Sequence, residues 1–380
     1  MQFHTTSYRS ATGWDAPLPA GLDHAQTLVL AFGASGFADD SRPFDELAAA
    51  FPQAVMAGCS TAGEIAAGQV HDASVSVAIA RFDHVRLAQV HTELAHSDDS
   101  EAAGKRLADR IDPAGLRAVF VLSDGLSVNG TRLVASLARH LPADVAISGG
   151  LSGDGSRFQR TWVLSEGRPH SHRLCAVAFY GERLRVGLGC AAGWLDFGPE
   201  RYITRSEGHV LYELDGKPAL DLYKEYLGVL ADGLPGAGLL FPLSIRPPLS
   251  DRKPLVRTVL AVDESLRSLT FAGDVPQGHI ARLMRATNDG LIHSASTAVQ
   301  LAARGVARDA PALVVSVSCV GRRLVLGERT EEEVEAIVDG APLGAAHVGF
   351  YSYGEISPGA GGGATELHNQ TMTVSVFSED

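Results

Sequence analysis

The sequence contains few cysteines: Cys59, Cys175, Cys190 and Cys319 are the only four in 380 residues. They are too few for a disulfide-stabilised scaffold and too far apart for a C-x-x-C metal or redox motif. We therefore expect four free thiols in a reducing compartment.

Basic residues are also scarce, because 32 Lys and Arg face 44 Asp and Glu and give a formal charge of -12. Such a charge disfavours binding to nucleic acid or to an anionic membrane surface, both of which require a basic surface. No apolar run reaches the roughly 18 residues of a membrane span, so we expect no membrane insertion. The first 17 residues lack a basic start and an apolar stretch, and we therefore expect no signal peptide and a cytoplasmic location.

Hydrophobic residues make up 45% of the sequence, which is enough for a sizeable core. The chain repeats one order of segments three times: strand, helix, strand, a loop with glycine beside an acidic residue, and strand. The units are expected to begin at Thr27–Phe32, Ala118–Gly125 and Ala312–Cys319. Their helices are expected at Phe44–Phe51, Thr131–Leu141 and Thr330–Gly340, and their last strands at Val75–Phe82, Leu174–Gly181 and Met372–Glu379.

A strand, helix, strand order implies parallel pairing by a crossover, and the short connection to the last strand implies mixed sheets. The sequence thus predicts an α/β fold with mixed β-sheets, crossover helices and internal strand–helix–strand duplication. Between the second and third units we expect a helix at Ala219–Gly228, a hairpin turning at Asp263–Ser265 and a long helix at His279–Arg304. The proline- and glycine-rich residues 231–254 indicate a boundary, which divides the chain into regions 27–228 and 229–380.

Ser60 and Cys59 lie in a segment, Gly58-Cys59-Ser60-Thr61-Ala62, that nearly matches the nucleophile elbow of serine hydrolases. In that elbow a helix follows the nucleophile at once, whereas here the next residues contain Gly68 and show no amphipathic period. We therefore expect no catalytic residue here, and a hydrolase with Ser60 or Cys59 as nucleophile remains an alternative.

The three glycine–acid loops are better suited to binding. Glycine lets backbone N–H groups approach a ligand, and the carboxylates of Glu64, Asp154 and Glu355 could pair with an ammonium group. Because the loops follow parallel strands, we expect them to meet at one sheet edge, where open α/β sheets bind ligands. The alternative is that these acids only close tight turns.

The C-terminal segment carries a second polar group, in which the glycine-rich run Gly359–Gly363 leads into Glu366–Thr371. Its side chains either satisfy the glycine-rich loop or face a ligand, and we favour the ligand. The sequence lacks G-x-G-x-x-G, a P-loop and H-E-x-x-H, so no nucleotide or metal site is assigned. A single histidine could still ligate haem without a short motif.

The segments "GCSTAGEI", "SGGLSGDG", "YKEYLG", "GFYSYGEI" and "ELHNQTMTVSVF" occur in an order that resembles the FIST family. The resemblance covers about residues 28–377 and implies an N-terminal and a C-terminal FIST region in tandem. It implies an intracellular sensory module that binds a small ligand such as an amino acid or a related metabolite. Some members are similar to haem proteins that sense nitric oxide and act on a histidine kinase.

By this resemblance the residues of the two signatures are candidate ligand-binding residues. They are Ser60, Thr61, Glu64, Gly153 and Asp154 in the first region, and Tyr353, Glu355, His368, Asn369 and Gln370 in the second. The implied protein is a cytoplasmic, non-catalytic sensor without a cofactor that binds its ligand between the regions. No kinase, cyclase or methyl-accepting segment is recognisable, so its output is expected to pass through a separate protein such as a histidine kinase. A haem-binding nitric oxide sensor is the alternative.

Overall fold

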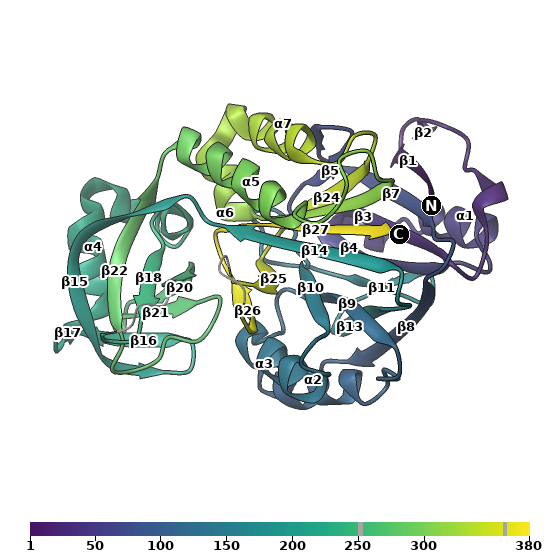
Figure 1. The fold of residues 1–380 in the computed structure, drawn as a ribbon. Helices are drawn as coiled ribbons and strands as arrows, with labels where there is room; N and C mark the ends of the chain where they lie inside the picture. Colours follow the sequence, from purple (N-terminus) through teal and green to yellow (C-terminus); the bar gives the residue numbers. More distant parts are fainter. Residues whose placement is uncertain (250–253, 360–362) are drawn as a thin grey trace.

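The computed structural model describes residues 1–249, 254–359 and 363–380. They form a larger part, here called the core (residues 1–191 and 288–380), and a smaller part, the lobe (residues 194–286). In Figure 1 the lobe lies at the left and the core at the right, with the two chain ends close together in the core. None of the helices in the described residues is long and apolar enough to cross a membrane.

Each unit of the core runs as strand, helix, parallel strand, hairpin and antiparallel strand. In unit one these are β3 (Thr27–Ala34), α1 (Arg42–Ala50), β4 (Val55–Thr61), the hairpin β5 (Glu64–Ala66) and β6 (Gln69–His71), and β7 (Ser74–Arg81). In unit two they are β9 (Leu116–Ser123), α3 (Gly130–His140), β10 (Ala146–Leu151), β11 (Val163–Ser165), β12 (Arg168–His170) and β13 (Arg173–Tyr180).

Unit three repeats the same order with one additional helix. It consists of β23 (Ala312–Cys319), α6 (Val320–Leu326), α7 (Thr330–Gly340), β24 (Ala346–Ser352), β25 (Gly354–Pro358), β26 (Thr365–His368) and β27 (Met372–Glu379). In all three units the two strands joined by the helix are parallel, and the last strand pairs antiparallel with the first. The predicted duplication and the α/β fold with mixed sheets are therefore confirmed.

Elements that the sequence analysis did not predict extend each unit. A further strand flanks each last strand: β1 (Gln2–Arg9), β8 (Arg86–Glu93) and β14 (Leu184–Ala191), with the short β2 (Gly13–Trp14) outside β1. Helix α2 (Ser100–Ala108) packs against α3, and α5 (Asn288–Ala302) packs against α7.

The hairpin of each unit pairs with a strand of another unit. Strand β5 of unit one pairs with β24 of unit three, β11 of unit two pairs with β4 of unit one, and β25 of unit three pairs with β10 of unit two. The exchange closes into a ring, and each of the three core sheets contains a hairpin from a neighbouring unit. The regions 27–228 and 229–380 consequently share two of these sheets.

The lobe is one antiparallel sheet inserted between β14 and α5. Its strands are β15 (Trp194–Glu207), β16 (Val210–Leu214), β17 (Lys217–Pro218), β18 (Leu243–Arg246), β19 (Leu255–Arg257), β20 (Val259–Asp263), β21 (Ser268–Phe271) and β22 (Ile280–Ala286). Helix α4 (Ala219–Leu227) packs against this sheet, so residue 228 falls inside the lobe. Residues 250–253 of the proline- and glycine-rich segment lie outside the described residues.

The predictions for this segment were mixed. The helix at Ala219–Gly228 and the hairpin turning after Asp263 are confirmed as α4 and as β20 and β21. The long helix at His279–Arg304 is wrong at its start, because Ile280–Ala286 form β22, which pairs with β15 and β18 in the lobe sheet. Helix α5 begins only after Thr287, whose Oγ1 accepts a hydrogen bond from the Gly290 N–H at 3.1 Å and caps the helix.

Arg322 on α6 holds the two places where the chain passes between core and lobe. Its guanidinium donates to the carbonyl oxygen of Ala192 at 2.5 Å and to that of Leu291 at 2.9 Å. Its charge is balanced by Glu333, whose Oε2 accepts from Arg322 Nε at 2.8 Å, and both side chains are fully buried. This pair fixes the lobe's attachment to the core.

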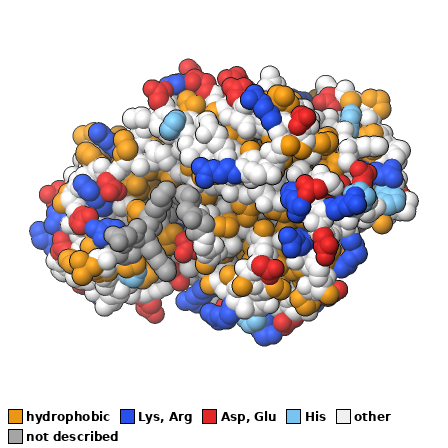
Figure 2. Space-filling model, viewed as in Figure 1, with side chains coloured by type: hydrophobic (Ala, Val, Ile, Leu, Met, Phe, Trp, Pro, Cys, Tyr) orange, Lys and Arg blue, Asp and Glu red, His pale blue; other side chains and the backbone are white. Residues whose placement is uncertain are grey.

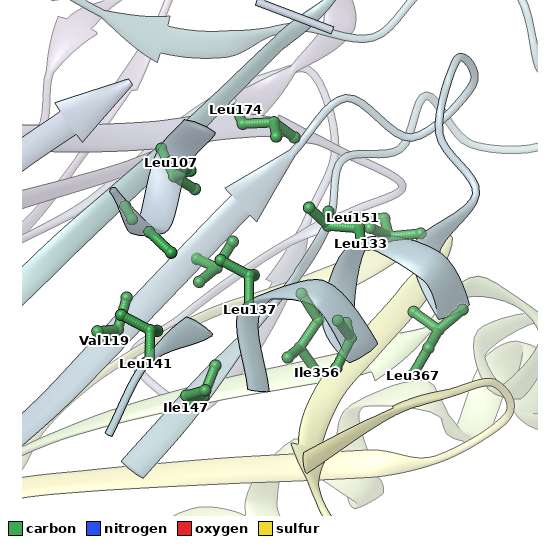
Figure 3. Close-up of a cluster of buried hydrophobic side chains, with 14 of the residues drawn as sticks. Leu107, Val119, Leu133, Leu137, Leu141, Ile147, Leu151, Leu174, Ile356 and Leu367 are labelled. Atoms are coloured by element: carbon green, nitrogen blue, oxygen red, sulfur yellow. The ribbon is translucent and has the colours of Figure 1, made fainter. Parts of the chain in front are cut away.

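Apolar side chains from neighbouring units fill the core. In the cluster of Figure 3, Leu133 and Leu137 of α3 lie among strand residues such as Val119 and Ile147 of their own unit. Leu367 and Ile356 of unit three join the same cluster, because their hairpin completes the sheet of unit two. The hydrophobic core is therefore built by the strand exchange rather than unit by unit.

We expect Leu137→Ala to lower the free energy of unfolding by roughly 2–5 kcal/mol, since Leu137 is fully buried and its removal leaves a cavity. Urea denaturation followed by circular dichroism measures the change. Leu343→Ala is the control, because Leu343 is 62% exposed and should cost little. Equal losses in both variants would contradict the assignment of this cluster as core.

Candidate functional site

The carboxyl ends of β4, β10 and β24 meet at one place, here called the junction. Backbone hydrogen bonds run around it from unit to unit: Ala62 N–H donates to Tyr351 O at 2.7 Å, and Gly153 N–H donates to Ser60 O at 2.9 Å. The ring closes with Tyr353 N–H, which donates to the carbonyl oxygen at the end of β10 at 3.2 Å. A Cβ atom on Gly153 would lie only 3.1 Å from the Ala62 nitrogen, so the close approach favours glycine.

The structure thus brings the three predicted loops together, but not at one sheet edge as the sequence analysis expected. Strands β4, β10 and β24 belong to three different sheets. Their ends converge because each hairpin crosses into the neighbouring sheet.

Glu64 and Glu355 occupy equivalent positions in units one and three. Thr61 Oγ1 and Ser74 Oγ donate to the Glu64 carboxylate, the latter at 2.8 Å. Ser352 Oγ donates to Glu355 at 2.6 Å, and a hydroxyl at the start of the last strand, Thr371 Oγ1, donates at 2.8 Å. Each carboxylate therefore ties a hairpin to the last strand of its own unit.

Burial dominates the electrostatics of these two acids, since Glu64 is 1% exposed and Glu355 is 0% exposed. Loss of water disfavours the charged form and raises the pKa of Glu64 to about 7 and that of Glu355 to about 8. The hydroxyl and backbone donors oppose this rise without cancelling it. Both groups therefore titrate near neutral pH.

Asp154, the acid of unit two, is fully buried and has a different set of partners. Its carboxylate accepts hydrogen bonds from the N–H groups of Phe158 and Gln159, each at 2.9 Å, and from the Tyr353 hydroxyl. The Tyr353 hydroxyl also contacts the Gly155 oxygen at 2.9 Å. Burial and the hydrogen bond to Asp154 raise the pKa of Tyr353, so this phenol stays neutral. The contact joins units two and three.

The polar group at the C-terminal strand lies behind the junction and is also buried. His368 Nε2 lies 2.9 Å from the Ser357 oxygen, and Asn369 Nδ2 donates to the Tyr353 oxygen at 3.3 Å. Gln370 Nε2 donates to the Leu239 oxygen of the lobe at 2.8 Å. The Oδ1 of Asn369 and the Oε1 of Gln370 have no hydrogen-bond partner among the described residues. Residues 360–362 of the preceding glycine-rich run lie outside the described residues.

The potential nucleophiles of β4 are enclosed. Ser60 is fully buried, and its Oγ accepts a hydrogen bond from the Trp162 N–H at 3.0 Å. Cys59 is also fully buried, which raises the pKa of its thiol well above the usual value. Cys59, Cys175 and Cys319 are free thiols, as predicted, and all three are buried. Among the described residues no group of histidine, cysteine, aspartate and glutamate side chains could hold a metal ion.

A partly open pocket, here called the lobe cavity, lies between the core and the lobe and has a volume of about 220 Å³. The aromatic rings of Tyr353 and Phe158 form part of its core wall and are stacked with centroids 4.6 Å apart. Its lobe wall includes Phe271, Thr270 and His209. No lysine, arginine, aspartate or glutamate lines it among the described residues.

The lobe cavity contains one residue of the predicted site, Tyr353, and Asp154 supports it from behind. The other predicted site residues do not line it. Sequence reasoning missed Phe158, Thr270, Phe271 and His209, since no motif marks them and the lobe sheet itself was not predicted. The cavity exists only where two separately formed surfaces face each other.

Three α/β units exchange hairpins and place their signature loops at one junction, and a pocket of about 220 Å³ lies between this core and the lobe. Family models for the FIST N domain and the FIST C domain match residues 27–217 and 219–358 in tandem. The chain belongs to the FIST family, as the resemblance predicted, and FIST domains are sensory domains of signal transduction.

The individual proteins that this chain resembles do not extend the family assignment. Uncharacterized protein MJ1623 of Methanocaldococcus jannaschii is 27% identical over 200 residues, which is 50% of this chain and 38% of that protein. The chain thus matches well under half the length of this relative. Two solved cyanuric acid hydrolase structures, one from A. caulinodans, are 13% identical, and each match covers 78% of this chain and 68% of the other. Their TM-scores of 0.26 and 0.24 are too low to support an argument.

The two junction glutamates predict a pH dependence of stability. A carboxyl whose pKa is higher in the folded state than in the unfolded chain stabilises the fold when protonated, and that stability is lost as pH rises through the folded pKa. Burial lowers the pKa of His347 and His368 to about 4. The stability of the fold therefore depends on these two histidines only below about pH 7. We expect the melting temperature to fall between about pH 6 and pH 9, and the fall to be smaller in Glu355→Gln.

Differential scanning calorimetry at one-unit pH steps measures this slope. Glu366→Gln is the matched control, because Glu366 is half-buried on β26 outside the junction. An identical slope in wild type and Glu355→Gln would show that Glu355 does not take up a proton on folding.

Proposed function

We propose that this protein is a non-catalytic sensor that binds a small metabolite in the lobe cavity. The observation that carries the proposal is the position of that cavity: it lies between core and lobe, and the junction residue Tyr353 forms part of its wall. Clefts and cavities between two parts of a chain are where small-molecule sites occur preferentially. Its volume of about 220 Å³ suits a ligand smaller than a typical drug.

The lining favours an uncharged ligand with an apolar or aromatic part. Phe158 and Phe271 offer ring faces, whereas Thr270 and His209 offer hydrogen-bonding groups. A free amino acid would have to bury an ammonium and a carboxylate without an opposite charge among the described lining residues, which is costly. Among amino acids and related metabolites, we therefore favour neutral derivatives such as amides or lactams.

Binding would signal by changing the position of the lobe. Besides the two chain crossings, polar contacts such as Asn129 Nδ2 to Asp274 Oδ1 at 2.9 Å and Arg257 Nη1 to the Leu367 oxygen at 3.3 Å join lobe and core. A small apolar cluster, which includes Trp194 of the lobe and Leu326 of the core, also spans the two parts. A ligand that contacts both walls favours the closed arrangement to the extent that it binds that arrangement more tightly. The regions 27–228 and 229–380 share two core sheets, which opposes motion of one region relative to the other. The lobe has its own sheet and would therefore be the part that moves.

The enclosure of Ser60 and Cys59 supports a non-catalytic role. The output would then pass to a separate cytoplasmic partner, for which a histidine kinase is the candidate that the family suggests. If the ligand leaves the autophosphorylation rate of a kinase bound to this protein unchanged, that kinase is not the partner.

We expect a thermal-shift screen of neutral amino-acid derivatives to yield a compound that stabilises the protein by about 2.7 kcal/mol at a hundred times its Kd. Thr270→Trp should abolish the effect, because the indole would fill the lobe wall of the cavity. Calorimetric titration of the purified variant measures the loss.

Thr204→Trp is the matched control, since Thr204 lies exposed on β15 in the same lobe and does not line the cavity. Binding that survives in Thr270→Trp, or is lost equally in both variants, would place the ligand elsewhere. Stabilisation only by charged amino acids would contradict the proposed ligand class.

The surroundings of three histidines do not favour the haem alternative. The buried His347 is bonded to Ser316, the buried His368 is bonded to Ser357, and His209 lines a cavity smaller than a tetrapyrrole. We expect no stoichiometric Soret band after addition of haemin, as measured by absorption spectroscopy and a pyridine haemochrome assay. A stoichiometric band that His209→Ala removes would overturn this expectation.

A further inference from the structure

A groove in the core, distinct from the lobe cavity, gathers arginines in an otherwise acidic chain. It has a volume of about 810 Å³ and is lined by residues of β8, of α2 and the turn after it, and of the start of β13. Its charged and titratable lining residues are three arginines, two histidines and two acids: Arg106, Arg110, Arg173, His91, His172, Glu93 and Asp99. It is called the arginine groove below.

Arg106 is fully engaged within the protein. Its guanidinium donates to both carboxylate oxygens of Asp99, at 2.9 and 2.7 Å, and to the Glu93 backbone oxygen at 3.0 Å. This arginine and Asp99 therefore form a neutral wall of the groove.

Arg173 and Arg110 are not balanced in this way. The side chain of Arg173 is 21% exposed, and its buried Nε has no hydrogen-bond partner among the described residues. Its nearest carboxylate, on Glu93, is 3.8 Å away and 82% exposed. Arg110 donates to the His91 backbone oxygen and forms no ion pair within the described residues. Both guanidinium groups thus keep donors available for an anion.

The backbone around the groove argues against a peptide as occupant. Strand β8 is the edge strand of its sheet, which is where an added peptide strand would pair. The backbone oxygens of His91 and Glu93 are already used by Arg110 and Arg106. Arginine side chains therefore occupy the edge that such a strand would need.

We propose that the arginine groove binds a small multivalent anion, a metabolite carrying a phosphate group or several carboxylates, through Arg110 and Arg173. The planar fork of a guanidinium matches two oxygens of a phosphate or carboxylate, and two such forks favour multivalent over monovalent anions. The groove of about 810 Å³ leaves room for the remainder of the molecule. This site does not depend on the lobe cavity or on its ligand.

The test is isothermal titration of the full chain with inorganic phosphate, pyrophosphate and citrate at constant ionic strength. We expect saturable binding of pyrophosphate or citrate that weakens about tenfold in Arg173→Gln and in Arg110→Gln, since each variant removes one charge-assisted contact. Arg117→Gln is the control, because Arg117 is exposed on β9 and does not line the groove.

Arg110 is exposed, so Arg110→Gln keeps the test valid if Arg173→Gln does not fold. No saturable binding of any of the three anions would overturn the proposal. Binding that is unchanged in Arg110→Gln, or weakened equally in Arg117→Gln, would also overturn it. If a glutamate decapeptide binds and the three anions do not, the groove is a protein-binding surface instead.

Discussion

Backbone hydrogen bonds at the junction, where β4, β10 and β24 end, hold the three units of the core in one arrangement. The hairpin of each unit pairs with a strand in the sheet of another unit, so no unit completes its sheet by itself. The close approach of Gly153 to Ala62 and the pairing of Tyr353 with Asp154 depend on this exchange. The exchange also brings hydrophobic residues of unit three into the core of unit two, as Figure 3 shows.

The signature acids differ in their physical roles. Glu64 and Glu355 each bind hydroxyl and backbone donors from their own unit and hold a hairpin against its last strand. Asp154 instead binds across units through Tyr353 and orders the loop that carries Phe158. Similar glycine–acid motifs therefore have different roles. Glu64 and Glu355 stabilise their own units, whereas Asp154 contacts Tyr353, which lines the lobe cavity.

The lobe has its own antiparallel sheet and is inserted into the core between β14 and α5. The buried Arg322 and Glu333 fix its attachment on the core side, and the cavity next to Tyr353 lies in the interface between lobe and core. Figure 2 shows basic and acidic side chains interspersed on one face of both lobe and core, with hydrophobic side chains gathered on parts of the lobe. Leu195 and Phe197 on β15 are exposed hydrophobic side chains of the lobe.

The sequence by itself determined the local elements and their threefold order, because strand alternation and helix periodicity depend on neighbouring residues. It also identified the family and the loops that meet at the junction. It could not determine that β25 pairs with β10, nor that residues 280–286 form a strand, because both depend on partners far along the chain. Only the tertiary structure decided that Glu64 and Glu355 are internally bonded while Tyr353 lines a cavity. That outcome depends on which surfaces face each other after folding, and no local pattern encodes it.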